Sequence, residues 1–409
     1  MRPSSAGGAL PLLPLLLGAA APLPGEQYAE RAGKLEGKKD AKAWLKLKDF
    51  AEEHLLWKER EEALRKTIDQ DPEGAEAHTR LDEVKVGEEW LPAEEAEARE
   101  AEENQGKGLV FYGTKWVPAK EADKLREADR KQVGWDCDLR IQTPRFVLYS
   151  ARSLPLSRRI IALLESDLAA YQRLYGSVWK AAPSAKPIRV YLFRDRASYE
   201  RKLQADLSSP PGLPHGMYSA VTKVCYLGLP PDYKPGLDPE AYTEEQTARV
   251  AAHEMLHAFD DLMSRSHTVS PNRADWVLEG RADHFGDSVL GRQVLPGRVH
   301  LLHVGGSMED RGVALAKGVE GLPLAQLLAM NTARFTGEGV REHYVMSWAL
   351  VHFLFHAEGG RHAPAFRKFL AGCPKQSSPA EFEKTVGRLA TLEPAFKDYV
   401  RKVLLPELE

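Results

Sequence analysis

Residues 253–257 read His-Glu-Met-Leu-His and lie within residues 244–263, a run rich in helix formers that contains neither glycine nor proline. We expect a helix here that begins near Thr243, where a capping-box pattern starts, with Pro239 still outside it. Apolar residues occupy almost every side, so this helix is expected to be buried. Two histidines four residues apart share one helical face and can bind a single zinc ion.

A third zinc ligand is expected in the next apolar helix, residues 275–285. A catalytic zinc ion usually has three protein ligands and one position for water, and Glu279 follows His257 by 22 residues. Asp283 lies four residues further, on the same helical face, where its carboxylate could accept the outer N–H of His253 or His257 and so orient the ring. We therefore predict that His253, His257 and Glu279 bind Zn²⁺ and that Asp283 supports them.

These residues carry a family resemblance. The His-Glu-x-x-His pattern followed by Trp-Val-Leu-Glu-Gly-Arg-Ala-Asp at 276–283 looks like the gluzincin zinc metallopeptidases with a peptidase MA-like domain. Residues 344–354, Tyr-Val-Met-Ser-Trp-Ala-Leu-Val-His-Phe-Leu, are similar to a helix in one bacterial branch of that family. The match is specific over 250–287, agrees only in element order over 138–357, and does not reach the N-terminal third. It implies a zincin-like fold, zinc as cofactor and peptide or protein substrates.

Two residues are expected to act in the chemistry. Glu254, beside the first ligand, is the expected general base of a zinc-dependent peptide-bond hydrolase. The resemblance implies that Tyr344, 65 residues beyond Glu279, stabilises the oxyanion, although a core position on an apolar helix face fits Tyr344 equally. His343 is a weaker substitute donor. Residues 216–220 lack the glutamate that family aminopeptidases carry there, which favours endopeptidase-like activity.

Other interpretations of the site stay open. A purely structural zinc ion would favour cysteine ligands, and none of Cys137, Cys225 and Cys373 is close in sequence. The main rival is a noncatalytic zincin-fold binding or scaffold protein that acts through its N-terminal helices. The intact Glu254 argues against it, because zinc binding does not need that neighbour. A hydrolase of a non-peptide amide or ester also fits these residues.

Several polar residues near the motif are expected to have no chemical role. Asp260 and Asp261 more often cap or solvate a helix end. His284 points off the ligand face if Glu279 points onto it. The remaining histidines, including those at 352 and 356, are expected to be structural or solvated.

Composition limits the partners. The 409 residues are 43% hydrophobic, and 56 basic against 59 acidic residues give a net charge of −3, so neither nucleic acid nor an acidic membrane surface is indicated as a partner. Residues 1–21 resemble a signal peptide, which predicts a secreted or periplasmic protein with no membrane span after its removal; a disordered cytosolic leader is the alternative. Cys137 and Cys225 could pair in an oxidising compartment, leaving Cys373 free.

An α+β protein of three parts is expected after this leader. Residues 22–134 form a charged, mostly helical region in which Trp-Leu-Pro-Ala at 90–93 recurs as Trp-Val-Pro-Ala at 116–119, 26 residues later. This region could bind a protein partner or serve as a solvated spacer. Residues 135–330 are the zincin-like catalytic domain, and residues 331–409 are a helical C-terminal subdomain that completes the active site.

The catalytic domain is expected to have a mixed sheet. Its elements should follow the order strand (139–149), helix (157–175), strand (188–193), hairpin (216–228) and active-site helix. In zincin-type folds the strand just before the active-site helix is an edge, so an extended peptide could add to it; a hairpin serving only the sheet fits equally. Gly280 should let the helix of residues 275–285 pass close to the active-site helix.

Overall fold

The fold was obtained as a computed structural model. It describes residues 24–53, 56–178, 186–208, 215–228, 239–264, 274–286, 289–290, 293–294, 308–373, 378–406 and 408. The expected leader, residues 1–21, lies outside these ranges.

The first described segments are the helices α1 (Pro24–Leu35), α2 (Ala41–Glu53), α3 (Trp57–Gln70) and α4 (Ala75–Arg80). The first three pack around the buried side chains of Trp44, Leu47 and Phe50.

The two Trp-x-Pro-Ala copies each form a two-stranded hairpin followed by a helix. The first copy comprises β1 (Glu83–Val86), β2 (Glu89–Pro92) and α5 (Ala93–Gly106). The second comprises β3 (Leu109–Tyr112), β4 (Lys115–Pro118) and α6 (Ala119–Val133). Each helix begins directly after the proline. The hairpins are an addition to the expected helices, and each has a glycine with positive φ at its two-residue turn.

A five-stranded mixed sheet follows, with strand order β5-β6-β7-β9-β8. The strands are β5 (Leu139–Gln142), β6 (Phe146–Ser150), β7 (Ile188–Leu192), β8 (Gly216–Ser219) and β9 (Val224–Leu227). Strands β6, β7 and β9 are parallel, and β5 and β8 are antiparallel edges. The expected single strand over 139–149 is therefore wrong, because the chain reverses there. Thr143 Oγ1 accepts the N–H of Phe146 at 3.0 Å, and Pro144 between them has no N–H to donate to a ladder.

Helices cover both faces of this sheet. On one face lie α7 (Leu154–Tyr175) and α9 (Pro239–Ser264), packed on apolar residues such as Leu148, Val190 and Cys225. On the other lies α8 (Arg196–Leu207), packed on tyrosines of the same strands such as Tyr191 and Tyr226. The alternation follows from the two-residue period of a strand.

Helix α9, which carries the His-Glu-x-x-His pattern, begins at Pro239 rather than near Thr243. A proline suits the first turn of a helix, because its missing N–H would have no partner there and its φ is already helical. The expected start was therefore four residues late.

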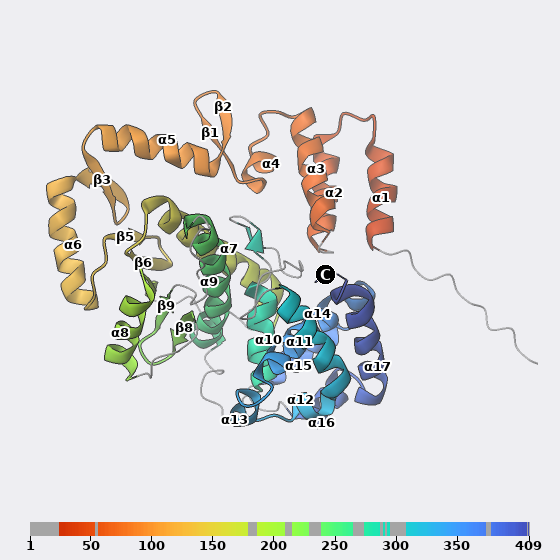
Figure 1. The fold of residues 1–409 in the computed structure, drawn as a ribbon. Coiled ribbons are helices and arrows are strands. Elements are labelled where there is room, and N and C mark those ends of the chain that lie inside the picture. Colours follow the sequence, from red (N-terminus) through yellow and green to blue (C-terminus); the bar gives the residue numbers. More distant parts are fainter. Residues whose placement is uncertain are drawn as a thin grey trace, which may run out of the picture.

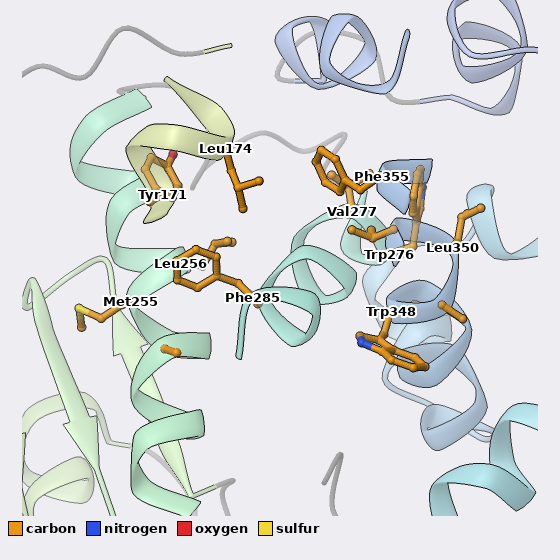
Figure 2. Packing of buried hydrophobic residues seen from close by; sticks show 14 of the residues in the cluster. Tyr171, Leu174, Met255, Leu256, Trp276, Val277, Phe285, Trp348, Leu350 and Phe355 are labelled. Carbon is orange, nitrogen blue, oxygen red and sulfur yellow. The ribbon is translucent and has the colours of Figure 1, made fainter. Parts of the chain in front are cut away.

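Helix α10 (Asp275–Gly286) lies between α9 and α14 (Val340–Gly360), as Figure 1 shows. In Figure 2, Phe285 of α10 lies toward Leu256 of α9, while Trp276 of α10 lies toward α14. A Cβ at Gly280 would come within 2.6 Å of the Ser347 carbonyl oxygen. Gly280 thus allows a close approach to α14, and the expectation that it faces α9 is wrong.

The remaining described residues form helices and one short hairpin. The hairpin consists of β10 (Val289–Leu290) and β11 (Gln293–Val294). The helices are α11 (Met308–Gly321), α12 (Leu324–Leu328), α13 (Thr332–Phe335), α15 (Ala363–Gly372), α16 (Pro379–Thr385), α17 (Leu389–Tyr399) and a π-helical turn, η1 (Val400–Leu404). They share one core with α7, α9 and α10, so the helical C-terminal part packs directly on the helices beside the sheet. None of the described helices has the length and apolar character that a membrane crossing requires.

Candidate metal centre

Three side chains from α9 and α10 point their donor atoms at one point. His253 Nε2 and His257 Nε2 are 3.3 Å apart, and Glu279 Oε2 lies 3.4 Å from the first and 3.6 Å from the second. The histidine side chains are 20% and 19% exposed, so the point they surround is open to water on one side. The structure therefore brings together the three residues predicted as ligands.

The separations fit one tetrahedral ion. Two donors that each lie about 2.0–2.1 Å from zinc at a tetrahedral angle are roughly 3.3–3.4 Å apart. The three measured separations lie at or slightly above this value. Two imidazoles and one carboxylate with one open side are also the donor set of a catalytic zinc site. The residues present fit the ion.

Asp283 holds the first histidine. Its Oδ1 lies 3.0 Å from His253 Nδ1, which leaves His253 Nε2 facing Glu279 and His257. Burial lowers the pKa of His253, but its hydrogen bonds to Asp283 and Glu279 outweigh burial and raise that pKa well above the ordinary value. Asp283 thus holds the Nδ1 side of the His253 ring, the kind of contact that orients a histidine.

Glu254 is anchored to the sheet edge. The backbone N–H of Tyr218 in β8 donates to Glu254 Oε2 at 2.7 Å. Strand β8 is the edge strand next to α9, so the carboxyl group of Glu254 lies between the active-site helix and that edge. The negative charge of Glu254 is also close enough to raise the pKa values of His253 and Tyr344.

Tyr344 of α14 faces the same carboxylates. Burial, followed by the negative charges of Glu279, Asp283 and Glu254, raises the pKa of Tyr344 far above its ordinary value, so its hydroxyl stays protonated. Among the described residues no hydrogen bond occupies that hydroxyl. Its ring packs 5.1 Å from Phe335. Tyr344 is therefore a half-buried packing residue whose hydroxyl keeps its proton.

His343 has a different position. It is buried, and its Nδ1 lies 2.8 Å from the Phe335 carbonyl oxygen, which ties α14 to α13.

Asp260, expected to cap or solvate a helix end, is a buried anchor instead. Arg281 of α10 donates to both of its oxygens at 2.9 and 3.0 Å, and Tyr171 of α7 donates at 2.8 Å. The hydrogen bonds of Asp260 thus join α7, α9 and α10 close to the candidate ligand residues. Asp261 next to it accepts from Tyr218 Oη at 2.6 Å and Lys223 Nζ at 2.5 Å, tying α9 to the β8–β9 hairpin. In the sequence, the one indication that Arg281 pairs with a buried acidic residue was that Arg281 follows Glu279 inside an apolar helix.

A second group of histidines lies on the other side of α10. His284 Nε2 is 2.8 Å from His356 Nε2, and the rings of His352 and His356 are 4.4 Å apart. Tyr399 of α17 contacts His352 Nδ1 at 2.9 Å. Burial lowers the pKa values of His284 and His356 well below the ordinary value. From the sequence we expected His284 to point away from the ligand face, but its contact with His356 of α14 was not predicted.

The three cysteines are free thiols, so Cys137 and Cys225 are not paired in this structure. Burial raises the pKa of Cys137 to about 11. Among the described residues, the cluster that could hold a metal ion consists of His253, His257 and Glu279 and includes none of these thiols.

No family model matches this sequence, and no curated protein matches it.

Proposed function

We propose that this protein is a zinc-dependent hydrolase that cleaves peptide bonds within extended polypeptides. The observation that carries the proposal is the convergence of His253, His257 and Glu279 at tetrahedral donor separations, with the carboxyl group of Glu254 beside them. A bound zinc ion would supply Lewis acidity, which makes water acidic enough to act as a nucleophile near neutral pH.

Glu254 would move the proton. Its Oε2 accepts the Tyr218 N–H, which leaves Oε1 to take a proton from the attacking water. The same oxygen would then give that proton to the leaving amine. The Tyr218 hydrogen bond fixes the carboxylate in place, so no reorganisation is needed during the transfer.

Tyr344 would neutralise charge on the former carbonyl oxygen. Its raised pKa keeps the proton on the hydroxyl, and a protonated hydroxyl can donate to a developing oxyanion. Asp283 would keep the His253 ring from turning.

The open edge of β8 supports an extended peptide as substrate. In the described sheet β8 pairs on one side only, with β9. Glu254 is bound to the backbone of this strand, so a peptide added along β8 would run past the base. Main-chain hydrogen bonding of this kind gives little selectivity for side chains, which favours endopeptidase-like activity.

Substitution Glu254→Gln tests the proposal. The variant should retain zinc after dialysis, while the rate of peptide cleavage falls by about 10²- to 10⁴-fold, because the base is lost and the ligands are not. Cleavage is measured on a peptide library with and without a chelator, and bound zinc by elemental analysis.

The control is Glu358→Gln, at an exposed glutamate that pairs only with Arg361 in the described structure, and it should cleave like wild type. Undiminished chelator-sensitive cleavage by Glu254→Gln would refute the role of the base. A wild-type protein that binds zinc and cleaves no peptide would instead favour a noncatalytic binding protein.

A further inference from the structure

The two hairpin–helix copies use the same turn. Gly87 in the first copy has a φ of 64° and Gly113 in the second has a φ of 71°, and each is the first residue of a two-residue turn. The offset of 26 residues holds through both hairpins and both helices, α5 and α6. Each residue that makes a contact in one copy can therefore be compared with the equivalent residue of the other copy, 26 positions away.

The second copy holds the edge strand β5. Gly113 N–H donates to the Arg140 carbonyl oxygen at 2.7 Å, and Gln142 N–H donates to the Gly113 carbonyl oxygen at 2.9 Å. The turn thus adds to the outer edge of the five-stranded sheet as a parallel bridge. An exposed sheet edge is a ready template for further strand pairing, and this turn covers it.

The same copy also binds the side chain of that strand. Asp129 of α6 pairs with Arg140 at 3.1 Å, and Tyr112 of β3 lies 5.7 Å from the Arg140 guanidinium. Tyr112 and Asp129 hydrogen bond to each other at 2.8 Å and are buried. The second copy is therefore a formed receptor for an extended strand that carries an arginine.

The first copy presents the equivalent positions to solvent. A Cβ at Gly87 would meet nothing within 4 Å, and among the described residues no hydrogen bond reaches its backbone. Val86, at the position of Tyr112, is 38% exposed, and Val84 on the same strand is 45% exposed. Figure 1 shows the β1–β2 hairpin projecting from the top of the molecule, whereas β3 lies close to β5.

The first copy also keeps a carboxylate in the matching place and has an acidic surround. Glu103 of α5 stands 26 residues before Asp129; it is exposed, and its pairing with Lys107 at 2.6 Å lies on the solvent-facing surface. Residues 83–107 contain nine glutamates against two lysines and one arginine, whereas residues 109–133 contain four acidic and six basic residues. Glu94 and Glu100 pair with α7, through Arg159 and Arg158.

We propose that the β1–β2 hairpin and α5 form a docking site for an extended segment of a partner polypeptide that carries an arginine or lysine. The backbone of the turn at Gly87 would form hydrogen bonds with the backbone of that segment, as the backbone of Gly113 does with β5. The exposed valines would cover its apolar side, and Glu103 would pair with its cation. This inference is independent of the proposed hydrolysis.

A synthetic peptide of residues 138–143 tests the proposal, because the second copy holds this same segment. Labelled peptide is titrated into the full-length protein and binding is followed by fluorescence anisotropy. The copy at Gly113 is already filled by its own strand, so added peptide should bind at Gly87. A peptide with Arg140 replaced by alanine, and one methylated on the backbone nitrogen of Gln142, should each bind about tenfold more weakly or worse.

Matched protein variants locate the site. Glu103→Lys should weaken peptide binding by about tenfold or more, while Glu102→Lys, with the same charge change on another face of α5, should not. Val86→Arg should weaken binding, while Val313→Arg, at a valine 64% exposed on α11, should not. Circular dichroism checks that each variant is folded.

Three results would overturn the proposal. The first is that the wild-type protein binds no peptide. The second is that Glu102→Lys and Glu103→Lys weaken binding equally, which would mean general attraction to an acidic surface. The third is that sedimentation shows a dimer that Val86→Arg dissociates, which would make a second copy of the chain the occupant.

Discussion

The two histidine groups on either side of α10 are built from the same residue type and spacing, yet their chemistry differs. His253 and His257 are four residues apart on α9, and His352 and His356 are four residues apart on α14. In the first group the Nε2 atoms are 3.3 Å apart with a carboxylate near both. In the second, His284 Nε2 and His356 Nε2 are 2.8 Å apart, which is a hydrogen-bond distance and shorter than two ligands of one tetrahedral zinc would have.

The carboxylates of α10 make this difference. Asp283 and Glu279 raise the pKa of His253, whereas burial, followed by the charge of His352, lowers the pKa values of His284 and His356. One helix thus supplies acids to α9 and an imidazole to α14. This difference is why we propose the first group, and not the second, as the zinc site.

Replacing the carboxylate of Glu279 should give the largest difference in zinc affinity between the two histidine groups. Glu279→Gln should lower zinc affinity by more than about 100-fold, because a ligand is lost. His356→Gln should leave zinc affinity unchanged, because His356 Nε2 lies at hydrogen-bond distance from His284 Nε2 and is not one of the three proposed ligands. Competition with a chromophoric chelator measures both affinities, and equal losses in the two variants would contradict the assignment.

Loss of the supporting carboxylate should have a smaller effect. Asp283→Asn removes the charge that orients His253 and should weaken zinc binding by about 10- to 100-fold. Asp398→Asn, at an exposed position on α17, serves as the control. Zinc affinity that is the same in both variants would mean that Asp283 is only a packing residue.

The smallest expected effect concerns stability against pH. Burial holds the pKa values of His284 and His356 below those of the unfolded chain, so on acidification the unfolded state takes up protons that the folded state does not. Stability from this group is present above the unfolded pKa of about 6.5 and is lost as pH falls through it. His356→Gln should cost about 1–2 kcal/mol at pH near 8 and less at pH near 5.

Urea unfolding of the metal-free protein at both pH values measures this difference. Glu358→Gln is the control, since Glu358 is exposed and lies outside the histidine group. A cost of His356→Gln that grows on acidification would show that the group is charged in the folded protein.

Much of the candidate site could be predicted from local pattern. His253 and His257 share a face because the helical period puts residues four apart in line, and the same period puts Asp283 under Glu279. The choice of Glu279 as the third donor needed only the requirement for one more ligand in a buried helix nearby. These predictions depend on properties within single helices.

Other features had no local signal. The reversal at Thr143 and the hairpins before α5 and α6 depend on short turns whose strands are stabilised mainly by what they pack against. The buried ion pair of Arg281 and Asp260 joins two helices, and nothing in the sequence of either helix indicates that these two residues pair. Tyr344 fitted a core residue and a donor equally, and its distance from Glu279 along the chain could not choose between them.

The sequence by itself determined which side chains share a helix face and which segments are buried, because hydrophobic periodicity and helix geometry are local. Only the tertiary structure decided which faces meet: that Gly280 approaches α14, that His284 joins His356, and that one hairpin copy is covered while the other is open. The reason is physical. Contacts across packed helices depend on crossing angles and on the shapes of both surfaces, and these arise only when the whole core closes.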